Sequence, residues 1–358
     1  MNEKLQLITI INMVLFFSLM MLSLVDVKKI SYIYISILFA LLCIFPVLRT
    51  VHYGDTENYY EYYTSVFEND RFEYLFSRLT EFSLSIGLGF TEYIFFVSLL
   101  TTSIYIYSLL KISKILNAEI KTAIFAIASS LAFFPYYYMT FETVRDGIST
   151  AIVLVSLVFL VKSQYVKYLI FIVVAILFHK GAFIFLFIPF LMKLNINNTR
   201  VLIVFTSVFL LSFIIKDFLL SLPFFGEKIN SLLVFYSRDL SSSKTVIVRY
   251  IIILLFSLFL LGRSEYDSRS YRVIKFIILI VIAASMFASF PDMHRRILLK
   301  IEFITYPLLM MLFLENNRNK RKYFLTSLFV IFYYIFFLSN YSAYYQLLNI
   351  SPLIDLVI

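Results

Sequence analysis

Ile251 to Leu261 reads IIILLFSLFLL, and Phe324 to Leu338 reads FLTSLFVIFYYIFFL. Neither stretch alternates polar and apolar residues, as the strands of a membrane β-barrel do. Helices and closed barrels are the only structures that span a bilayer with every backbone polar group hydrogen-bonded. The two stretches therefore predict transmembrane helices.

The composition of the whole chain agrees with a membrane protein. Of its 358 residues, 61% are hydrophobic and 15% are charged, and the mean hydropathy is +0.89. A soluble domain is nearer half apolar and a quarter charged, so this chain has too little polar surface to cover a soluble core. The first apolar run, about residues 5–25, lacks the small-residue cleavage site of a signal peptide, and we expect a retained helix. The single cysteine, Cys43, lies in an apolar run and predicts no disulfide framework.

Apolar stretches near the ~20 residues needed to cross the hydrocarbon recur along the chain. The stretch at 166–192 is too long for one helix and carries His179 and Lys180 at its middle, so we expect two shorter or re-entrant helices that meet at this pair. No repeat and no Gly/Ser linker divides the sequence, which predicts one multi-pass domain, residues 1–358, built as an all-α bundle of about 10–13 spans. The other predicted spans lie at about 5–25, 30–48, 91–110, 122–139, 147–161, 201–221, 247–262, 273–291, 297–314 and 323–340.

The basic residues of the short connections predict the orientation, because Lys and Arg collect on the cytoplasmic side of a membrane protein. With an outer N-terminus, the inner connections hold 17 basic and 5 acidic residues, and the rest of the chain holds 14 basic and 17 acidic residues. The net charge of +9 therefore indicates membrane topology rather than a nucleic-acid-binding surface.

Two outer connections are long, at 49–90 and at 222–246. The second half of the first one predicts an amphipathic helix in the membrane interface, either as a cap on the bundle, which is the commoner role, or as part of a site. Its apolar residues at helical spacing are Phe72, Leu75, Phe76, Leu79 and Phe82.

The charged residues that are not explained by topology all emerge on the outer face, from four separate parts of the chain. All three histidines of the protein are among them. A charge at the centre of the membrane costs about 2.5–3.5 kcal/mol, and less near the edge, so such residues usually have a partner or a function. They are Arg49, His52 and Asp55; Glu142, Arg145 and Asp146; His179 and Lys180; and Asp292, His294, Arg295 and Arg296.

The first two groups each allow a structural and a functional interpretation. Asp55 either accepts backbone N–H groups in the turn after Gly54 or faces a substrate hydroxyl. Arg145 either pairs with Glu142 or Asp146, or binds an anionic ligand such as a phosphate with its planar guanidinium.

The other two groups are equally ambiguous. His179 is either a hydrogen-bonded structural residue, or a general acid, a general base or a hydrogen-bond donor to phosphate near neutral pH. Arg295 and Arg296 oppose the positive-inside tendency, which an anionic substrate, a lipid headgroup or a salt bridge would explain. Lys300 and Glu302 follow within the next span, and we expect them to pair with neighbours.

Other kinds of chemistry lack a motif in this sequence. There is no Walker motif, no dinucleotide fingerprint and no convincing set of metal ligands, so we expect no cofactor, no metal and no aqueous nucleotide substrate. Group transfer on the outer face then needs a donor activated in advance, such as a lipid pyrophosphate.

Three segments resemble the EpsG family of Wzy-type polysaccharide polymerases. They are LRTVHYGDTENY at 48–59, FETVRDGISTA at 141–151 and AILFHKGAF at 175–183, and RRILLKIEF at 295–303 is similar more loosely. The resemblance covers about residues 25–340. The sequence departs from the family pattern at Asp146, where an amide is expected, and at Gly181, where serine is common.

The resemblance implies a GT-C-like or Wzy-like fold in the bacterial cytoplasmic (inner) membrane, with an active site on the extracytoplasmic side. The implied reaction joins oligosaccharide repeat units carried on undecaprenyl pyrophosphate. Arginines such as Arg145 would stabilise the departing pyrophosphate without a metal, and Asp55 or His179 would accept the proton of the attacking hydroxyl. The expected substrate-binding residues are Arg49, His52, Glu142, Lys180, His294, Arg295 and Arg296. The expected partners are membrane lipids and the flippase and chain-length regulator of the same pathway.

Two other functions stay open from the sequence. A lipid-linked glycan ligase would use the same donor with a different acceptor, and only the product separates it from a polymerase. A transporter or flippase would distribute charges along a central pathway that opens to both faces. The predicted charges lie on one side, which favours the polymerase over the transporter.

Overall fold

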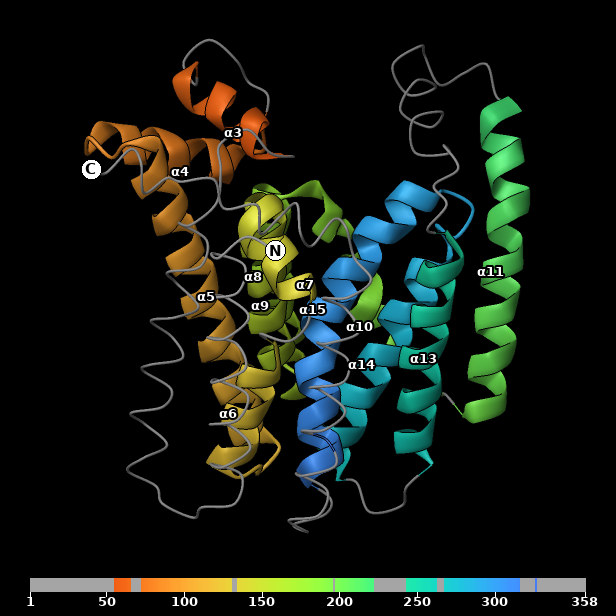
Figure 1. Ribbon diagram of the computed structural model, residues 1–358. Coiled ribbons are helices and arrows are strands. Elements are labelled where there is room, and N and C mark those ends of the chain that lie inside the picture. Colours follow the sequence, from red (N-terminus) through yellow and green to blue (C-terminus); the bar gives the residue numbers. More distant parts are fainter. Residues whose placement is uncertain are drawn as a thin grey trace, which may run out of the picture.

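The computed structural model describes residues 55–65, 72–130, 134–195, 197–221, 243–262, 267–315 and 326. Every element within these ranges is a helix, which confirms the predicted all-α class (Figure 1). In chain order they are α3 (Asp55–Thr64), α4 (Tyr74–Ser85), α5 (Phe90–Ile115), α6 (Ile120–Ser129), α7 (Phe134–Tyr137), the π-helix η3 (Tyr138–Glu142), α8 (Val144–Val161), α9 (Tyr165–Phe178), the 3-10 helix η4 (Lys180–Phe187), α10 (Ile188–Leu191), α11 (Asn198–Ser221), α13 (Ser243–Leu261), α14 (Ser268–Ser285) and α15 (Pro291–Glu315).

Four of the described helices are long and apolar enough to cross a membrane, and several shorter apolar helices accompany them. The structure therefore confirms a polytopic helical membrane protein. The predicted spans at 5–25 and 30–48 lie outside the described residues, as does 323–340 apart from Thr326. Most of the predicted outer connection at 222–246 lies outside them as well. The four long helices are Phe90–Ile115, Val144–Val161, Asn198–Lys216 and Met293–Glu315.

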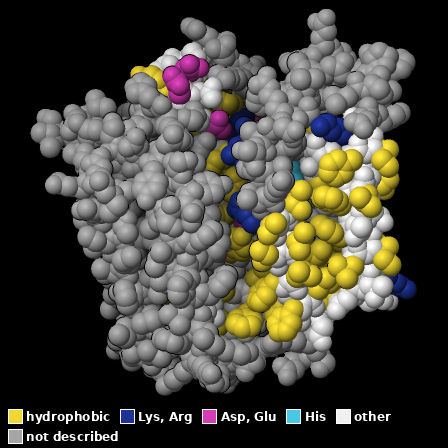
Figure 2. All heavy atoms as spheres, turned by 45° about the vertical axis from the view of Figure 1, so that its right-hand side comes forward, with side chains coloured by type: hydrophobic (Ala, Val, Ile, Leu, Met, Phe, Trp, Pro, Cys, Tyr) yellow, Lys and Arg dark blue, Asp and Glu magenta, His cyan; other side chains and the backbone are white. Residues whose placement is uncertain are grey.

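The apolar surface of the bundle is what lipid contact requires. On α11, Leu202, Ile203 and Ile214 are exposed, and on α13 the exposed residues include Ile252 and Phe259. Figure 2 shows the broad apolar face that such side chains form on this side of the molecule. An exposed apolar face of this kind favours acyl chains over water as its solvent.

Two predicted helices are interrupted in the structure. The stretch at 166–192 breaks where expected, because α9 ends at Phe178 and His179 adopts an extended backbone (φ −158°, ψ 124°) before η4 begins. The predicted span at 122–139 is not one α-helix, since α6 ends at Ser129 and the π-helix η3 begins at Tyr138. Apolar periodicity predicts burial of these residues and does not report the local change of helix type.

Helices α3 and α4 lie across one end of the upright bundle, called here the upper end (Figure 1). The upper end also holds the first turns of α5, α8 and α15 and the last turn of α9. Phe76 of α4 is fully buried in a cluster with Tyr59 of α3 and Tyr93 of α5. The amphipathic helix predicted near 72–82 is thus α4, and it packs as a cap on the bundle.

At the opposite end of the bundle, called here the lower end, basic side chains bind the C-terminal carbonyls of two helices. Arg269 donates to the carbonyl of Ile115 at 3.1 Å, and Arg272 donates to the carbonyl of Val161 at 2.7 Å. These carbonyls belong to the last residues of α5 and α8, where a helix has no further partners for them. A cation at a helix C-terminus also interacts favourably with the helix dipole.

Candidate active site

The break after α9 places a histidine beside a lysine from a distant helix. The Lys300 ammonium of α15 lies 3.2 Å from Nδ1 of His179. A Cβ added at Gly181 would collide with this ammonium, so the glycine leaves the space that Lys300 occupies. A side chain at this position would therefore displace the end of the Lys300 side chain or the ring of His179.

Asp146 binds both of these side chains. Its Oδ1 lies 2.6 Å from Nδ1 of His179 and 2.7 Å from Nζ of Lys300. The side chains of Asp146 and Lys300 are buried, and that of His179 is 20% exposed. Asp146 stands in the first turn of α8, where the helix dipole also favours a negative charge. We call these three residues the acid–base cluster.

Nδ1 of His179 faces one acceptor, the carboxylate of Asp146, and two donors, the N–H of Gly181 and the ammonium of Lys300. An imidazole nitrogen and a carboxylate oxygen 2.6 Å apart repel unless a proton lies between them, so we assign the proton to Nδ1 of His179. The N–H of Gly181 lies 3.0 Å from the same nitrogen and can donate to it only when that proton is absent. In the assigned tautomer the lone pair of the neutral ring is on Nε2, which can then accept a proton.

A second carboxylate holds Arg145, the residue before Asp146. Oε2 of Glu73 lies 2.5 Å from Nη1 of Arg145, and Oε1 accepts a hydrogen bond from the backbone N–H of Lys180 at 3.1 Å. The guanidinium also stacks over the ring of Phe72, with its carbon 4.3 Å from the ring centre. We call this arrangement of Arg145, Glu73 and the Lys180 N–H the anion site.

The charge of Glu73 follows from these contacts. Burial alone would raise the pKa of this carboxyl, but the positive charge of Arg145, the charge of His179 when its ring is protonated, and the N–H of Lys180 outweigh burial, so the pKa lies below its ordinary value. A lowered pKa means that the ion pair stabilises the fold above the pKa of the unfolded chain, and that this contribution disappears as the pH falls through the folded value. Glu73 is therefore ionised at neutral pH.

The hydroxyl of Tyr59 in α3 lies within electrostatic range of both Asp55 and Arg145. Burial raises the pKa of its hydroxyl, the charge of Arg145 lowers it, and the charges of Asp55 and Asp146 raise it further. All three charged groups are thus within electrostatic range of this one hydroxyl. Asp55 itself is partly exposed as the first residue of α3.

A separate group of polar side chains joins α13 to α15. Arg249 donates to both oxygens of the buried Glu302, and Tyr306 donates to Oε1 of Glu302 at 2.7 Å. Lys300 and Glu302 are two positions apart, about 200° around the helix, so they face different sides of α15. The expected pairing of both charges with neighbours is confirmed, each with its own partner.

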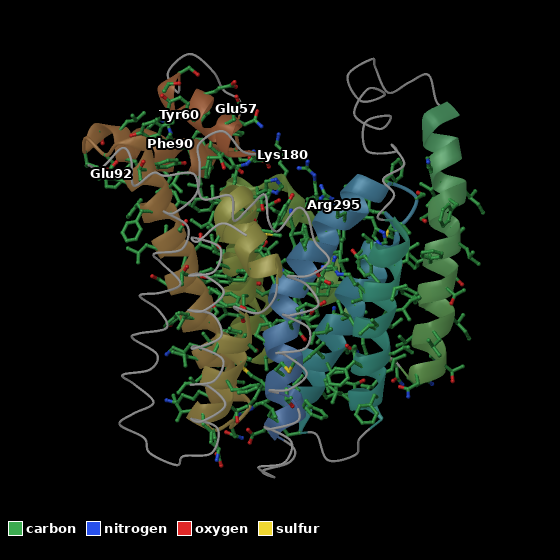
Figure 3. The ribbon with its side chains drawn as sticks, in the orientation of Figure 1. Glu57, Tyr60, Phe90, Glu92, Lys180 and Arg295 are labelled. Atoms are coloured by element: carbon green, nitrogen blue, oxygen red, sulfur yellow. The ribbon has the colours of Figure 1, made fainter. Side chains whose placement is uncertain are left out.

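The structure brings together some of the predicted site residues. Arg145, His179 and the backbone of Lys180 meet at the upper end, and Figure 3 shows the side chains of Lys180 and Arg295 there as well. Arg296 precedes Lys300 by one helical turn and so shares its side of α15.

The remaining predicted residues have other surroundings. The ring of His294 is buried and stacked on Tyr250, with ring centres 4.3 Å apart and planes 4° from parallel. Glu142 is the last residue of η3, and its side chain is outside the described part of the chain. Arg49 and His52 lie outside the described residues altogether.

Sequence reasoning missed two functional candidates, Glu73 and the specific role of Lys300. The expected partners of Arg145 were Glu142 or Asp146, but the partner in the structure is Glu73, seventy-two positions away in the chain. Glu73 was interleaved in an amphipathic pattern, which gave no reason to single it out. Lys300 did carry a signal, because an ionisable residue inside an apolar span marks a functional site by default.

Comparison with known proteins gives one match. The model of the EpsG family matches residues 32–352, which is most of the chain. No curated protein and no solved structure matches.

Proposed function

This chain belongs to the EpsG family, a family of Wzy-type polysaccharide polymerase-like proteins, and on that premise we propose that it polymerises lipid-linked oligosaccharide repeat units. The observation that carries the proposal is that the acid–base cluster lies directly beside the anion site. Arg145 of the anion site and Asp146 of the acid–base cluster are consecutive residues in the first turn of α8. Glycosyl transfer from a lipid pyrophosphate needs one group that takes a proton and another that takes developing negative charge.

His179 is the proposed general base. Nε2 accepts the proton of the acceptor sugar hydroxyl as its oxygen attacks the anomeric carbon of the donor. The bond from that carbon to the pyrophosphate oxygen breaks, and the electron pair leaves with undecaprenyl pyrophosphate. Asp146 stabilises the imidazolium that forms, and Lys300 keeps Asp146 in its anionic form. Asp55, the first residue of α3 at the same end of the bundle, is the alternative base.

Arg145 is the proposed contact to the leaving group. Its guanidinium can bind two phosphate oxygens at once, and Phe72 holds its plane in place. Lys180, Arg295 and Arg296 supply further positive charge at the upper end. The loss of one such contact should slow the reaction by about 10²–10³, or about 2–4 kcal/mol.

The charge of the lower end supports an outward-facing site. The residues described there hold ten basic and three acidic side chains, which the positive-inside tendency assigns to the cytoplasm. The upper end then faces away from the cytoplasm, and we propose the bacterial cytoplasmic membrane as the location. The basic residues are Lys111, Lys114, Lys121, Lys162, Lys167, Lys193, Arg200, Arg269, Arg272 and Lys275, and the acidic residues are Glu119, Asp267 and Glu315.

Reconstitution tests the proposal. The purified chain in lipid vesicles, supplied with an undecaprenyl-pyrophosphate-linked repeat unit, should produce glycans of two or more units and release undecaprenyl pyrophosphate. His179→Ala should strongly reduce extension, because the proposed base is then absent. Lys162→Ala, which removes a charge at the C-terminal end of α8 at the lower end of the bundle, is the control and should extend normally.

Two results would overturn the proposal. One is the absence of any extension of the lipid-linked repeat unit by the wild-type chain, whereas normal extension by the His179→Ala variant would overturn only the role of His179 and leave Asp55 as the base. The other is transfer of a complete glycan to an acceptor that carries no lipid pyrophosphate, with no extension of single units, which is the activity of a ligase.

A further inference from the structure

The anion site is already filled by an anion of the protein itself. Both carboxylate oxygens of Glu73 are engaged, one by the guanidinium of Arg145 and the other by the N–H of Lys180. A guanidinium and a backbone N–H that converge on two oxygens are also what recognises a phosphate group. The carboxylate therefore occupies the place where an oxyanion of a ligand would bind.

We propose that Glu73 is a latch which fills the pyrophosphate site in the resting protein and is displaced when the pyrophosphate of the lipid-linked donor binds. This inference rests on the polymerase function proposed above. It assigns Glu73 a role in donor binding and not in the chemical step.

The position of Glu73 allows it to leave without unfolding the cap. It is the residue before α4 and has an extended backbone (φ −69°, ψ 151°). The anchors of α4 are further along, where Phe76 and Thr80 are fully buried and Thr80 bonds the hydroxyl of Tyr93 at 2.8 Å. A rotation of the Glu73 side chain is therefore independent of the contacts that hold the helix.

The charges around the site favour the exchange. The carboxylate of Glu73 brings one negative charge to Arg145, whereas a pyrophosphate diester brings two and offers more acceptor oxygens, and the exposed side chain of Lys180 adds positive charge nearby. Glu73 and the bound ligand would repel each other if both stayed. In the absence of donor, Glu73 keeps Arg145 paired, so that the site does not expose an uncompensated charge near the membrane.

Binding of inorganic pyrophosphate tests the latch without any turnover. Titration calorimetry on the purified full chain should show that Glu73→Gln binds pyrophosphate about tenfold more tightly than the wild type, because no carboxylate competes. Glu81→Gln is the matched control: Glu81 lies in the same amphipathic segment and pairs with Arg78 at 2.5 Å on the exposed side. This control should bind as the wild type does.

A double-mutant cycle separates a latch from a general effect of charge. In an Arg145→Ala background, Glu73→Gln should change the affinity much less, because the contested guanidinium is gone and only the N–H of Lys180 remains. Undiminished tightening in this background, or tightening that Glu81→Gln reproduces, would overturn the proposal. Unchanged or weaker binding by Glu73→Gln itself would also overturn it.

Two further measurements keep the test decisive. If Glu73→Gln does not fold, Glu73→Asp keeps the charge but shortens the reach to both contacts, and it should bind pyrophosphate more tightly than the wild type; equal affinity would refute the latch. In the reconstituted reaction, Glu73→Gln should lower KM for the lipid-linked donor. Tighter pyrophosphate binding in a chain that forms no glycan would refute the polymerase function and not the latch.

Discussion

At the scale of the residue, the central group is Asp146, a buried carboxylate that contacts two other ionisable side chains. Its partners come from elements 33 and 154 positions later in the chain, His179 and Lys300. A buried charge is tolerated when it is paired and hydrogen-bonded, and removal of one partner leaves the other uncompensated. Asp146 and Lys300 therefore depend on each other more than on the surrounding apolar residues.

The first prediction at this scale concerns Lys300→Met. The variant should lower the free energy of unfolding by about 3–5 kcal/mol, because Asp146 loses its permanent positive partner in a buried position. Thermal unfolding of the detergent-solubilised protein measures the change. The double variant Lys300→Met with Asp146→Leu should lose less than the sum of the single variants, since both charges are then absent. Equal stability of wild type and Lys300→Met would contradict the buried ion pair.

At the scale of the element, two irregular helices position the site. The extended residue between α9 and η4 presents His179, and the π-helix η3 leads into the turn of α8 that carries Arg145 and Asp146. Single-turn π-helices often occur at functional sites. Gly147 permits this junction, because a Cβ there would collide with the carbonyl oxygen of Met139 in η3.

At this scale we predict that Gly147→Ala disrupts the packing between η3 and the first turn of α8. The methyl group meets backbone and not a flexible side chain, so η3 and α8 must separate, at a cost of about 1–3 kcal/mol in stability. Glycan extension should fall with it, because the two charged residues of the same turn move. Gly262→Ala is the control, since the nearest atom to its Cβ is 3.6 Å away. Similar stability of the two variants would show that the close approach at Gly147 has no consequence.

At the scale of the whole molecule, the two ends of the bundle differ in the charged side chains that they hold. The acid–base cluster and the anion site lie at the upper end, where Figure 3 also shows Lys180 and Arg295. The lower end carries the basic excess and the lysine and arginine contacts to helix C-termini. This polarity is what a one-sided enzyme requires, whereas a transporter needs access to its charges from both sides.

Cysteine labelling tests this polarity. Replacement of Cys43, the single cysteine of the chain, gives a background in which one new thiol can be followed. In intact cells, a membrane-impermeant maleimide should modify Lys180→Cys, because that residue is exposed at the upper end. Lys162→Cys should react only after the cells are permeabilised. Labelling of Lys162→Cys alone would invert the orientation, and access to Lys180→Cys from both sides would favour transport.

The sequence alone predicted what depends on local pattern. Apolar runs of membrane length predicted the helices, because lipid leaves the backbone no other way to satisfy its polar groups. The charged pair inside 166–192 predicted the break at His179, and Lys300 and Glu302 were expected to be paired because buried charges are costly. The segments around Arg145 and His179 pointed to the EpsG family, which the comparison over residues 32–352 confirms.

The tertiary structure alone decided which charges meet. Nothing near Arg145 in the chain indicates Glu73 as its partner, since Glu142 and Asp146 are closer in sequence and equally acidic. The choice depends on how α4 packs against α9, which brings Glu73, the residue before α4, to Arg145 in the first turn of α8. Periodicity reports which side chains are buried, but the pairing of distant segments follows from three-dimensional packing, and therefore from the whole chain at once.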